Sequence, residues 1–473
     1  MSTNPEPAVP RRALLRGAAA AGVLAATGPL TGCALGGGGG GRDSAHGEKS
    51  AANPLGVDPA APLEVVIFNG GLGEEYARNH EVMFQQRHPR AHIRHSATQE
   101  IAKTLQPRFV GGDPPDVVNN AGANQIDFNS LVAQGALADL GPLLDAPSLD
   151  DPAARVRDTL LPGAVESGTF DGRVLALNYA YTAYGVWYSG RLFADRGWAY
   201  PRTWDDMIAL CRRIKAAGIA PWAYQGKHPR YLSWPILASA AKLAGPEVLV
   251  AIDNLEPNAW KHEAVTAAAE AYRQLVVDRY LLPGSEGMDH VQAQTEWCRG
   301  RAAFVSCGSW LENEQRAVTP ADFRMTLAPT PSLTTGDRLP FQAVRGTAAE
   351  SFIVPAKAHN VAGGLEYLRV MLSKAGAADF TRRTSSLTCV RDGAAGVPLT
   401  PGLASVTRVL AASGAHTFNF RYGQFYRRLE RDLIDAACGE FFAGRLDTAG
   451  FTSRCQRAAD EIARDDSVKK YRR

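Results

Sequence analysis

The stretch Leu63-Glu64-Val65-Val66-Ile67-Phe68 decides the fold class, because it is a short β-branched run that ends directly in Asn69-Gly70-Gly71. Such a run between turn residues is typical of a buried strand. A polar helix is expected next, over residues 74–88, and Pro89 ends it. The first unit of the fold is therefore a strand followed by a helix.

The same alternation continues along the chain. A second strand is expected over residues 92–95, a helix over 101–109, and a buried strand over 117–120 after the turn at 113–116. Strand, helix, strand, helix, strand at short spacing predicts an α/β fold with a parallel sheet. Further strands are expected over residues 173–177, 186–188, 302–306 and 351–355, and further helices over 204–217, 232–244, 264–277, 361–374, 422–438 and 448–464. Thr203 is expected to cap its helix by accepting from the amide of Asp206.

Ligands of open α/β sheets bind beyond the carboxyl ends of the strands. The residues at these positions are amides, aromatics and glycines rather than acids and bases. They are Asn69-Gly70-Gly71, Asn119-Asn120, residues 179–184, Trp310 and Arg345. This composition favours binding over catalysis.

The first 32 residues have the architecture of a secretory signal peptide. Arg11, Arg12 and Arg16 precede an uncharged apolar stretch over residues 18–30, which is too short for a stable membrane span. Leu30-Thr31-Gly32-Cys33 resembles a bacterial lipobox, in which the thiol of Cys33 is lipidated, and the paired arginines resemble a twin-arginine signal. The alternative is an ordinary signal peptide with an incidental cysteine. Residues 33–62, with six consecutive glycines at 36–41, are expected to form a flexible tether.

The length, charge balance and apolar segments of the chain limit the fold and the functions that it can have. The roughly 410 residues after the tether are too many for one core and indicate two compact lobes. Without residues 1–32 the chain has 48 basic and 47 acidic residues, so no basic face is available for a nucleic acid. No later segment has the apolar length of a membrane span.

Six cysteines follow Cys33 in the sequence, and an oxidising location permits disulfides between them. Cys438 could pair with Cys455, and Cys298 with Cys307; the alternative for each is a buried, unpaired thiol. No Cys/His spacing typical of a metal site is present, so we expect neither a metal nor a cofactor.

Several stretches resemble the extracellular solute-binding proteins of carbohydrate ABC importers, over essentially the whole mature chain. They are residues 63–71, 178–190, 198–206 and 303–312. Within that family, Asn53-Pro54-Leu55-Gly56-Val57, residues 106–109 and residues 363–367 are similar to actinobacterial lipoproteins that bind N-acetylglucosamine and diacetylchitobiose.

The resemblance implies an α/β, type II periplasmic-binding-protein-like fold with two discontinuous lobes that close on a ligand about a hinge. Lobe 1 is expected over residues 63–175 plus 344–415, and lobe 2 over 178–342 plus 416–473. The implied function is capture of N-acetylglucosamine or a chitobiose-type sugar outside the membrane by a lipid-anchored monomer, which delivers it to the permease subunits. The alternative ligand is another mono- or oligosaccharide.

A sugar site needs two kinds of contact. Hydroxyl groups at the ring edge require fixed donors and acceptors, and the apolar faces of the ring favour flat aromatic surfaces. Trp310, which follows Gly308-Ser309 at a strand end, is the main stacking candidate, with a core tryptophan as its alternative. The other expected ligand-binding residues are Asn69, Gly70, Gln99, Asn119, Asn120, Tyr181, Thr182, Tyr231, Trp234, Arg345 and Phe425. For the asparagines the alternative is turn formation or helix capping, and for Arg345 it is an ion pair with Glu350.

Three other functions compete with sugar capture. A glycoside hydrolase needs two carboxylates at a defined separation, and Asp116, Asp127, Glu166 and Glu312 lie in no recognisable acid/base motif, so we expect no catalytic residues. A ferric or siderophore binder would use Tyr179, Tyr181, Tyr184 and Tyr188, but their spacing along a strand points half of them into the core. A purely structural envelope lipoprotein would show no ligand-induced change.

Overall fold

Strand β1 (Leu63–Phe68) forms at the predicted place and is central to the parallel part of the sheet. In the computed structural model, which describes residues 45–473, β1 pairs in parallel with β2 (Ile93–Thr98) on one edge and with β3 (Val117–Asn119) on the other. Helices α1 (Glu75–Arg87) and α2 (Ile101–Gly111) connect the three strands, as the sequence predicts. The α/β expectation is therefore confirmed.

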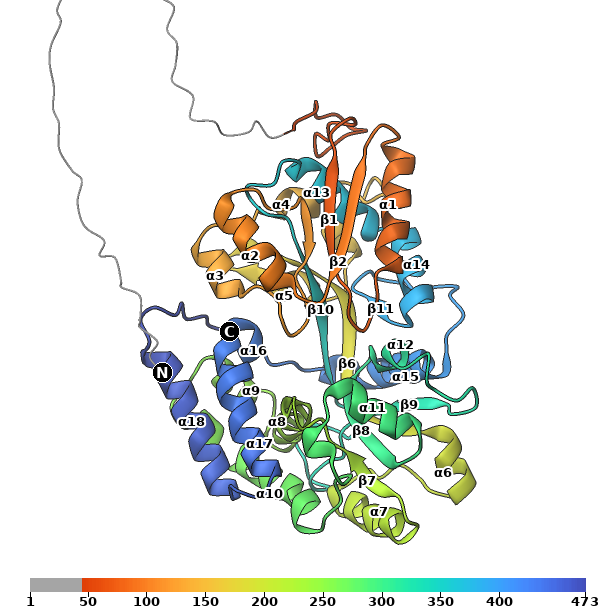
Figure 1. Ribbon diagram of the computed structural model, residues 1–473, viewed down its shortest axis with the longest axis vertical. Coiled ribbons are helices and arrows are strands. Elements are labelled where there is room, and N and C mark those ends of the chain that lie inside the picture. The colour runs from red at the N-terminus through yellow and green to blue at the C-terminus, as the bar shows by residue number, and fades with distance from the viewer. Residues whose placement is uncertain (1–44) are drawn as a thin grey trace, which may run out of the picture. The chain divides into compact units, whose positions relative to one another are not determined.

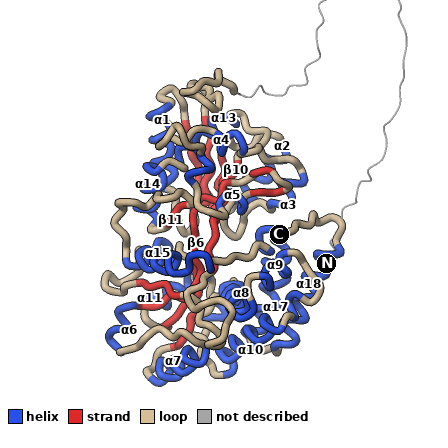
Figure 2. Tube along the Cα trace, turned by 180° about the vertical axis from the view of Figure 1, so that it is seen from behind, coloured by secondary structure: helices blue, strands red, loops and turns tan. Residues whose placement is uncertain are grey.

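The complete sheet has nine strands and is mixed rather than parallel. Its order is β2-β1-β3-β10-β6-β8-β7, and β9 (Met325–Ala328) and β11 (Leu387–Thr388) also pair with β6. Strand β6 (Leu177–Ser189) pairs antiparallel with β10 (Arg345–Ile353) and with β8 (Ala302–Gly308), whereas β7 (Ala220–Ala223) is parallel to β8. Figures 1 and 2 show β6 and β10 side by side as the strands that connect the β1–β3 region to the β7–β9 region.

Helices pack around this sheet (Figure 2). After β3 the chain forms α3 (Phe128–Ala133), α4 (Gly141–Asp145), α5 (Ala164–Ser167), α6 (Gly190–Arg196), α7 (Trp204–Ala216), α8 (Arg230–Ala244), α9 (Glu247–Asp253), α10 (Glu263–Val277), α11 (His290–Cys298) and α12 (Leu311–Glu314). The C-terminal part adds α13 (Val361–Met371), α14 (Lys374–Thr384), α15 (Pro401–Ser413), α16 (Tyr422–Phe425), α17 (Asp435–Phe442) and α18 (Thr448–Arg464). The Thr203 hydroxyl accepts from the Asp206 amide at 3.3 Å, so the predicted cap of α7 is confirmed.

The strand predictions for residues 173–177 and 186–188 are wrong in their extent. Asp171 and Gly172 have φ angles of 51° and 73°, and this turn joins two short strands, β4 (Thr169–Phe170) and β5 (Arg173–Val174), into a separate hairpin. The chain then enters β6, which continues through residues 186–188 because they pair with β8 on one edge and with β9 on the other.

The predicted helix over residues 422–438 is interrupted at Tyr426, and the residues on both sides of the break are helical. This residue has a non-helical backbone (φ −135°, ψ 76°), and its hydroxyl accepts from the Tyr471 amide at 2.9 Å. A π-helix over Leu429–Ile434 then leads into α17. Packing against the C-terminal segment thus overrides the helical pattern.

Two apolar cores lie within the described residues, and β6 contributes to both. Leu177 and Tyr179 belong to the smaller core, which surrounds β1, α1, α13 and α14. Val186 and Trp187 belong to the larger core, which contains α7, α8 and α10. The strand therefore links the packing of the two regions.

The signal peptide, Cys33 and the glycine run lie outside the described residues. The end of the predicted tether is folded, because Leu55 and Val57 are buried in the smaller core and Asn53 bonds the backbone of Val57 in both directions. Over residues 45–473, no helix is both long enough and apolar enough to cross a bilayer.

Candidate ligand-binding site

The middle of β6 and β10 forms the base of the candidate site. In their antiparallel register Tyr184 lies opposite Arg345, and Thr182 lies opposite Thr347. Directly opposed residues share a face of the sheet, and alternate residues of one strand do so as well. Thr182, Tyr184, Arg345 and Thr347 therefore lie on one face, and the predicted site residue Tyr181 lies on the other.

Four aromatic side chains meet over this face, and we call them the aromatic cluster: Tyr184, Tyr231, Trp234 and Trp310. The Tyr184 ring is 5.2 Å from Trp234 and 5.6 Å from Trp310, both edge to face, and Tyr231 is 4.9 Å from Trp234 and 6.4 Å from Trp310. Strand β6, helix α8 and the start of α12 supply these rings. The structure thus brings together three predicted residues and adds Tyr184, which alternation along one continuous strand would have included with Thr182.

Trp310 occupies its position because two glycines leave room for its indole. A Cβ atom on Gly308 would lie 1.9 Å from the Trp310 ring, and one on Gly71 would lie 3.2 Å from it. The indole is partly exposed and packs at the edge of the larger core. It therefore faces the loop after β1 with an aromatic surface that is not fully covered.

The Arg345 guanidinium is stacked between aromatic rings beside this cluster. Its Cζ lies 3.7 Å from the ring centre of Phe420, 4.0 Å from Tyr184 and 5.2 Å from Trp234. Nε donates to Asn419 Oδ1 at 3.1 Å, whereas Nη1 is buried and has no hydrogen-bond partner. Burial lowers the pKa of Arg345, although nearby acidic groups oppose that effect. Phe420 and Asn419 had no signal in the sequence, because their role depends on where the loop before α16 crosses the sheet.

Glu430 provides an anionic group on the far side of Trp234. The indole Nε1 donates to Glu430 Oε1 at 3.2 Å, and Arg431 pairs with Oε2 at 3.2 Å. Burial opposes ionisation, but Arg431 and Arg230 outweigh it and lower the pKa of Glu430. Glu430 is therefore a carboxylate at neutral pH.

Asn119 and Glu350 form a second polar group, where β3 meets β10. The Asn119 amide donates to the Ser351 carbonyl at 3.3 Å and to Glu350 Oε2 at 3.5 Å, and its oxygen accepts from the Tyr76 hydroxyl at 3.5 Å. Glu350 has a left-handed backbone, with φ 57°, which is strained for a residue with a side chain. Burial raises the pKa of Glu350 to about 7. No ion pair joins Glu350 to Arg345 in the part of the chain that the structure describes.

The other predicted residues divide into exposed positions and structural ones. Asn69 and Gln99 are exposed beyond the ends of β1 and β2. Gly70 lies under the Phe68 ring, where a Cβ atom would approach to 2.1 Å, so a side chain here would displace that ring. The Asn120 side chain holds the backbone N–H and C=O of Ile126 at 2.8 and 3.0 Å, which is the turn-forming alternative.

Phe425 is separate from the aromatic cluster. Its ring stacks on Tyr471 with a centre distance of 5.0 Å, Arg421 covers it at 4.5 Å, and its carbonyl accepts from Asn129. Phe420, rather than Phe425, supplies the ring next to Arg345.

Hydrogen bonds join the segments on opposite sides of the candidate site. Asn313 in α12 donates to the Gly71 carbonyl at 2.6 Å, and Gln424 donates to the Ser167 carbonyl at 2.8 Å. Each bond links a residue of predicted lobe 1 to one of predicted lobe 2. The loop after β1 is thus held against α12 beside Trp310.

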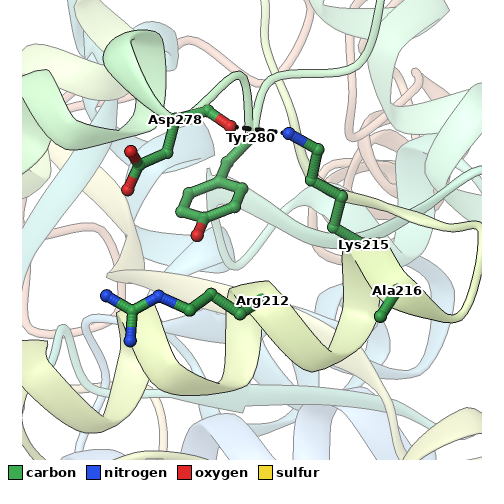
Figure 3. Close-up of a pocket in the computed structure, with 5 residues that line it drawn as sticks. All are labelled: Arg212, Lys215, Ala216, Asp278 and Tyr280. Atoms are coloured by element: carbon green, nitrogen blue, oxygen red, sulfur yellow. Dashed lines mark hydrogen bonds between the residues drawn. The ribbon is translucent and has the colours of Figure 1, made fainter.

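A separate pocket of about 500 Å³ lies between α7 and the end of α10 (Figure 3). It is lined by Arg212, Lys215, Ala216, Asp278 and Tyr280, and the Lys215 ammonium donates to the Asp278 carbonyl at 2.8 Å. It shares no residue with the aromatic cluster or with the predicted site.

The described cysteines form no disulfide, and the tyrosines of β6 form no metal site. All six cysteines after residue 45 are buried and unpaired, and burial raises the pKa of Cys298 to about 11. Tyr179 is in the smaller core and donates to the Met371 carbonyl at 2.7 Å, on the opposite face of β6 from Tyr184. Among the described residues no group of three His, Cys, Asp or Glu is arranged to hold a metal ion.

With this geometry established, comparison with known proteins identifies the family. The sequence pattern of the bacterial extracellular solute-binding proteins matches residues 71–378. The chain belongs to this family. The solute-binding family is not an enzyme family, and the two-lobed type II fold expected from the sequence is confirmed.

Among characterised relatives, the diacetylchitobiose binding protein NgcE of Streptomyces coelicolor is 36% identical over 431 residues, which cover 90% of each chain. Two solved structures share the fold. A protein described in work on xylan utilization by Caldanaerobius polysaccharolyticus has a TM-score of 0.71 at 15% identity, over 84% of this chain and 99% of its own. A chitin oligosaccharide binding protein has a TM-score of 0.67 at 18% identity, over 85% and 99%.

Proposed function

We propose that this solute-binding protein captures a carbohydrate outside the cytoplasmic membrane and presents it to the permease of an ABC importer. The observation that carries the proposal is the aromatic cluster over the polar face of β6 and β10. Partly exposed indole and phenol rings match the apolar faces of a pyranose. The polar groups beside them, where the Asn419 amide donates to the Thr347 hydroxyl at 2.9 Å, match its edge.

We further propose diacetylchitobiose, or N-acetylglucosamine itself, as the ligand. The support is the name of the Streptomyces relative, which is similar to this chain over 90% of its length. Another mono- or oligosaccharide is the second candidate, because proteins of the same fold are described as binding a chitin oligosaccharide and raffinose.

Calorimetry with purified residues 42–473 tests the ligand. We expect saturable binding of diacetylchitobiose and weaker binding of cellobiose, maltose and xylobiose. Preference for one of the other sugars would change the proposed ligand but support the proposed carbohydrate-binding function. Failure to bind any sugar in the panel would reject that function. Mass spectrometry after long incubation should recover intact sugar, because the proposed protein binds without catalysis.

The arrangement in the cell is proposed with the function. Lobe 1 comprises residues 63–175 and 344–415, and lobe 2 comprises 178–342 and 416–473, with β6 and β10 as hinge strands. The protein acts as a monomer anchored through a lipid on Cys33. Closure follows from tighter binding of the sugar to the closed form.

A further inference from the structure

The Arg345 guanidinium has a buried nitrogen, Nη1, that the protein leaves without a hydrogen-bond partner. The residue is 9% exposed, and its Nη1 is buried without a hydrogen-bond partner. Burial of an unpaired donor is unfavourable, and more so for a charged group. A buried donor that persists at the centre of a binding site is expected to be completed by an acceptor on the ligand.

The surroundings of Arg345 restrict the direction from which that acceptor approaches. Phe420 and Tyr184 lie within 3.7 and 4.0 Å of Cζ, so aromatic rings cover the faces of the guanidinium plane. Only its edges can form hydrogen bonds, and Asn419 already occupies the Nε edge. Buried Nη1 therefore suits an acceptor atom lying in the guanidinium plane.

The local charge favours a neutral acceptor over a carboxylate. Glu430 is ionised and lies across Trp234, close enough to interact with the Arg345 charge. A ligand carboxylate would add a second negative charge to this group. A carbonyl oxygen needs one donor and no counter-ion.

Aromatic side chains beside Nη1 also suit a methyl group next to that carbonyl. Tyr184 and Trp234 present ring surface at 4.0 and 5.2 Å from the guanidinium carbon. A hydroxyl group would accept from Nη1 but would gain nothing from the rings and would need an acceptor for its own proton. An acetamido group supplies both the planar carbonyl and the apolar methyl.

We propose that Arg345 Nη1 binds the carbonyl oxygen of the ligand's N-acetyl group and so selects 2-acetamido sugars over sugars with a hydroxyl at that position. This inference rests on the sugar-binding function proposed above. Tyr184 and Trp234 receive the methyl group, and Asn419 and Phe420 fix the plane of the guanidinium.

The test compares two disaccharides with the same β-1,4-linked backbone, diacetylchitobiose and cellobiose, in calorimetry on the full mature chain. Arg345→Met should lose roughly tenfold to hundredfold of the affinity for diacetylchitobiose, as expected for a hydrogen bond to a charged group, and change the affinity for cellobiose by less than about threefold. Arg345→Lys should recover part of the loss. Arg202→Met is the matched control, because Arg202 stacks on Phe341 at 4.7 Å away from the cluster and should affect neither sugar.

A second measurement separates recognition from a structural role. The infrared amide I band of diacetylchitobiose, labelled with ¹³C in its acetyl carbonyl, should shift on binding to the wild type and to Arg202→Met but not to Arg345→Met. An Arg345→Met variant that binds both sugars like the wild type, loses both equally, or retains the shift would overturn the proposal. A wild type that binds cellobiose but not diacetylchitobiose would overturn it as well, while a wild type that binds no sugar would reject the proposed function instead.

Discussion

Trp310 is the residue whose role the structure sharpens most. Its indole is held over Gly308 and faces Tyr184 and Tyr231, and it is only partly buried. Trp310→Ala should therefore cost about 2 kcal/mol or more in binding free energy, at least about twentyfold in affinity, because a desolvated aromatic contact is lost. Calorimetry with diacetylchitobiose measures this loss.

The control for Trp310 is a tryptophan of similar burial outside the cluster. Trp198 is partly buried and contacts Phe193 at 5.7 Å, so Trp198→Ala should lower the melting temperature and leave affinity unchanged. If Trp310→Ala instead lowers the melting temperature and binds sugar normally, Trp310 is a core residue and not a platform.

Glu350 gives the apo protein a specific pH dependence. Its pKa is about 7 in the fold, because burial disfavours the charge, against 4.5 for an ordinary glutamate. The folded state binds this proton more tightly than the unfolded state does, so the contribution to stability is complete below pH 4.5 and is lost as the pH rises through 7. Glu350→Gln should raise the melting temperature at pH 8 and change it little at pH 5.

Differential scanning fluorimetry of wild type and variant across this pH range measures the effect. Glu286→Gln, at an exposed position, should show no pH-dependent difference. An identical difference at pH 5 and pH 8 for Glu350→Gln would mean that Glu350 does not titrate in this range.

At the scale of elements, the loop after β1 and helix α12 form a contact across the candidate site. The Asn313 amide donates to the Gly71 carbonyl at 2.6 Å. If this bond belongs to the closed form, Asn313→Ala reduces the closed population and should weaken sugar binding about twofold to tenfold, with little change in melting temperature.

A matched variant removes a hydrogen bond of the same kind within one region. Asn79 in α1 donates to Asp379 in α14 at 3.0 and 3.1 Å. Asn79→Ala should lower the melting temperature and preserve affinity. Equal affinity of Asn313→Ala and the wild type would show that the Gly71 contact does not contribute to closure.

The sequence predicted elements well where the signal was local. β1, α1 and the Thr203 cap are defined by patterning and capping residues within a few positions, and all three form as expected. β6 was divided incorrectly, because its continuity depends on pairing with β10 and β8, more than 100 residues away. The break at Tyr426 likewise depends on Tyr471.

In the candidate site, too, residues with a local sequence signal were predicted and residues placed only by tertiary contacts were not. Tyr231, Trp234 and Trp310 stand out in the sequence as large rings at element ends, and they come together in the structure. Phe420 and Asn419 lie in an unpatterned loop, and only the tertiary fold brings them to Arg345. Asn120 was predicted as a ligand-binding residue because it is an amide at a strand end. In the structure its side chain instead holds the backbone of Ile126 in the following loop.

At the scale of the whole molecule, we propose that a lipid on Cys33 determines where the protein resides. The lipobox-like ending and the glycine run predict that Cys33→Ala is released to the medium or remains unprocessed. Fractionation of cells with an immunoblot measures this, and Cys211→Ala, which removes a buried thiol, is the control that should stay with the membrane. Wild-type membrane levels of Cys33→Ala would rule out the lipid anchor.

Strand β6 also influences how the protein unfolds. A single run of backbone places Tyr179 in the smaller core and Trp187 in the larger one, so loss of order in either core releases a strand that the other core requires. The described unit should consequently melt as one cooperative transition, with calorimetric and van't Hoff enthalpies in agreement, although its length would ordinarily allow two. Two resolved calorimetric peaks would show that the cores unfold independently. A single transition would mean that, through this one continuous strand, sensitivity to heat is a property of both regions together.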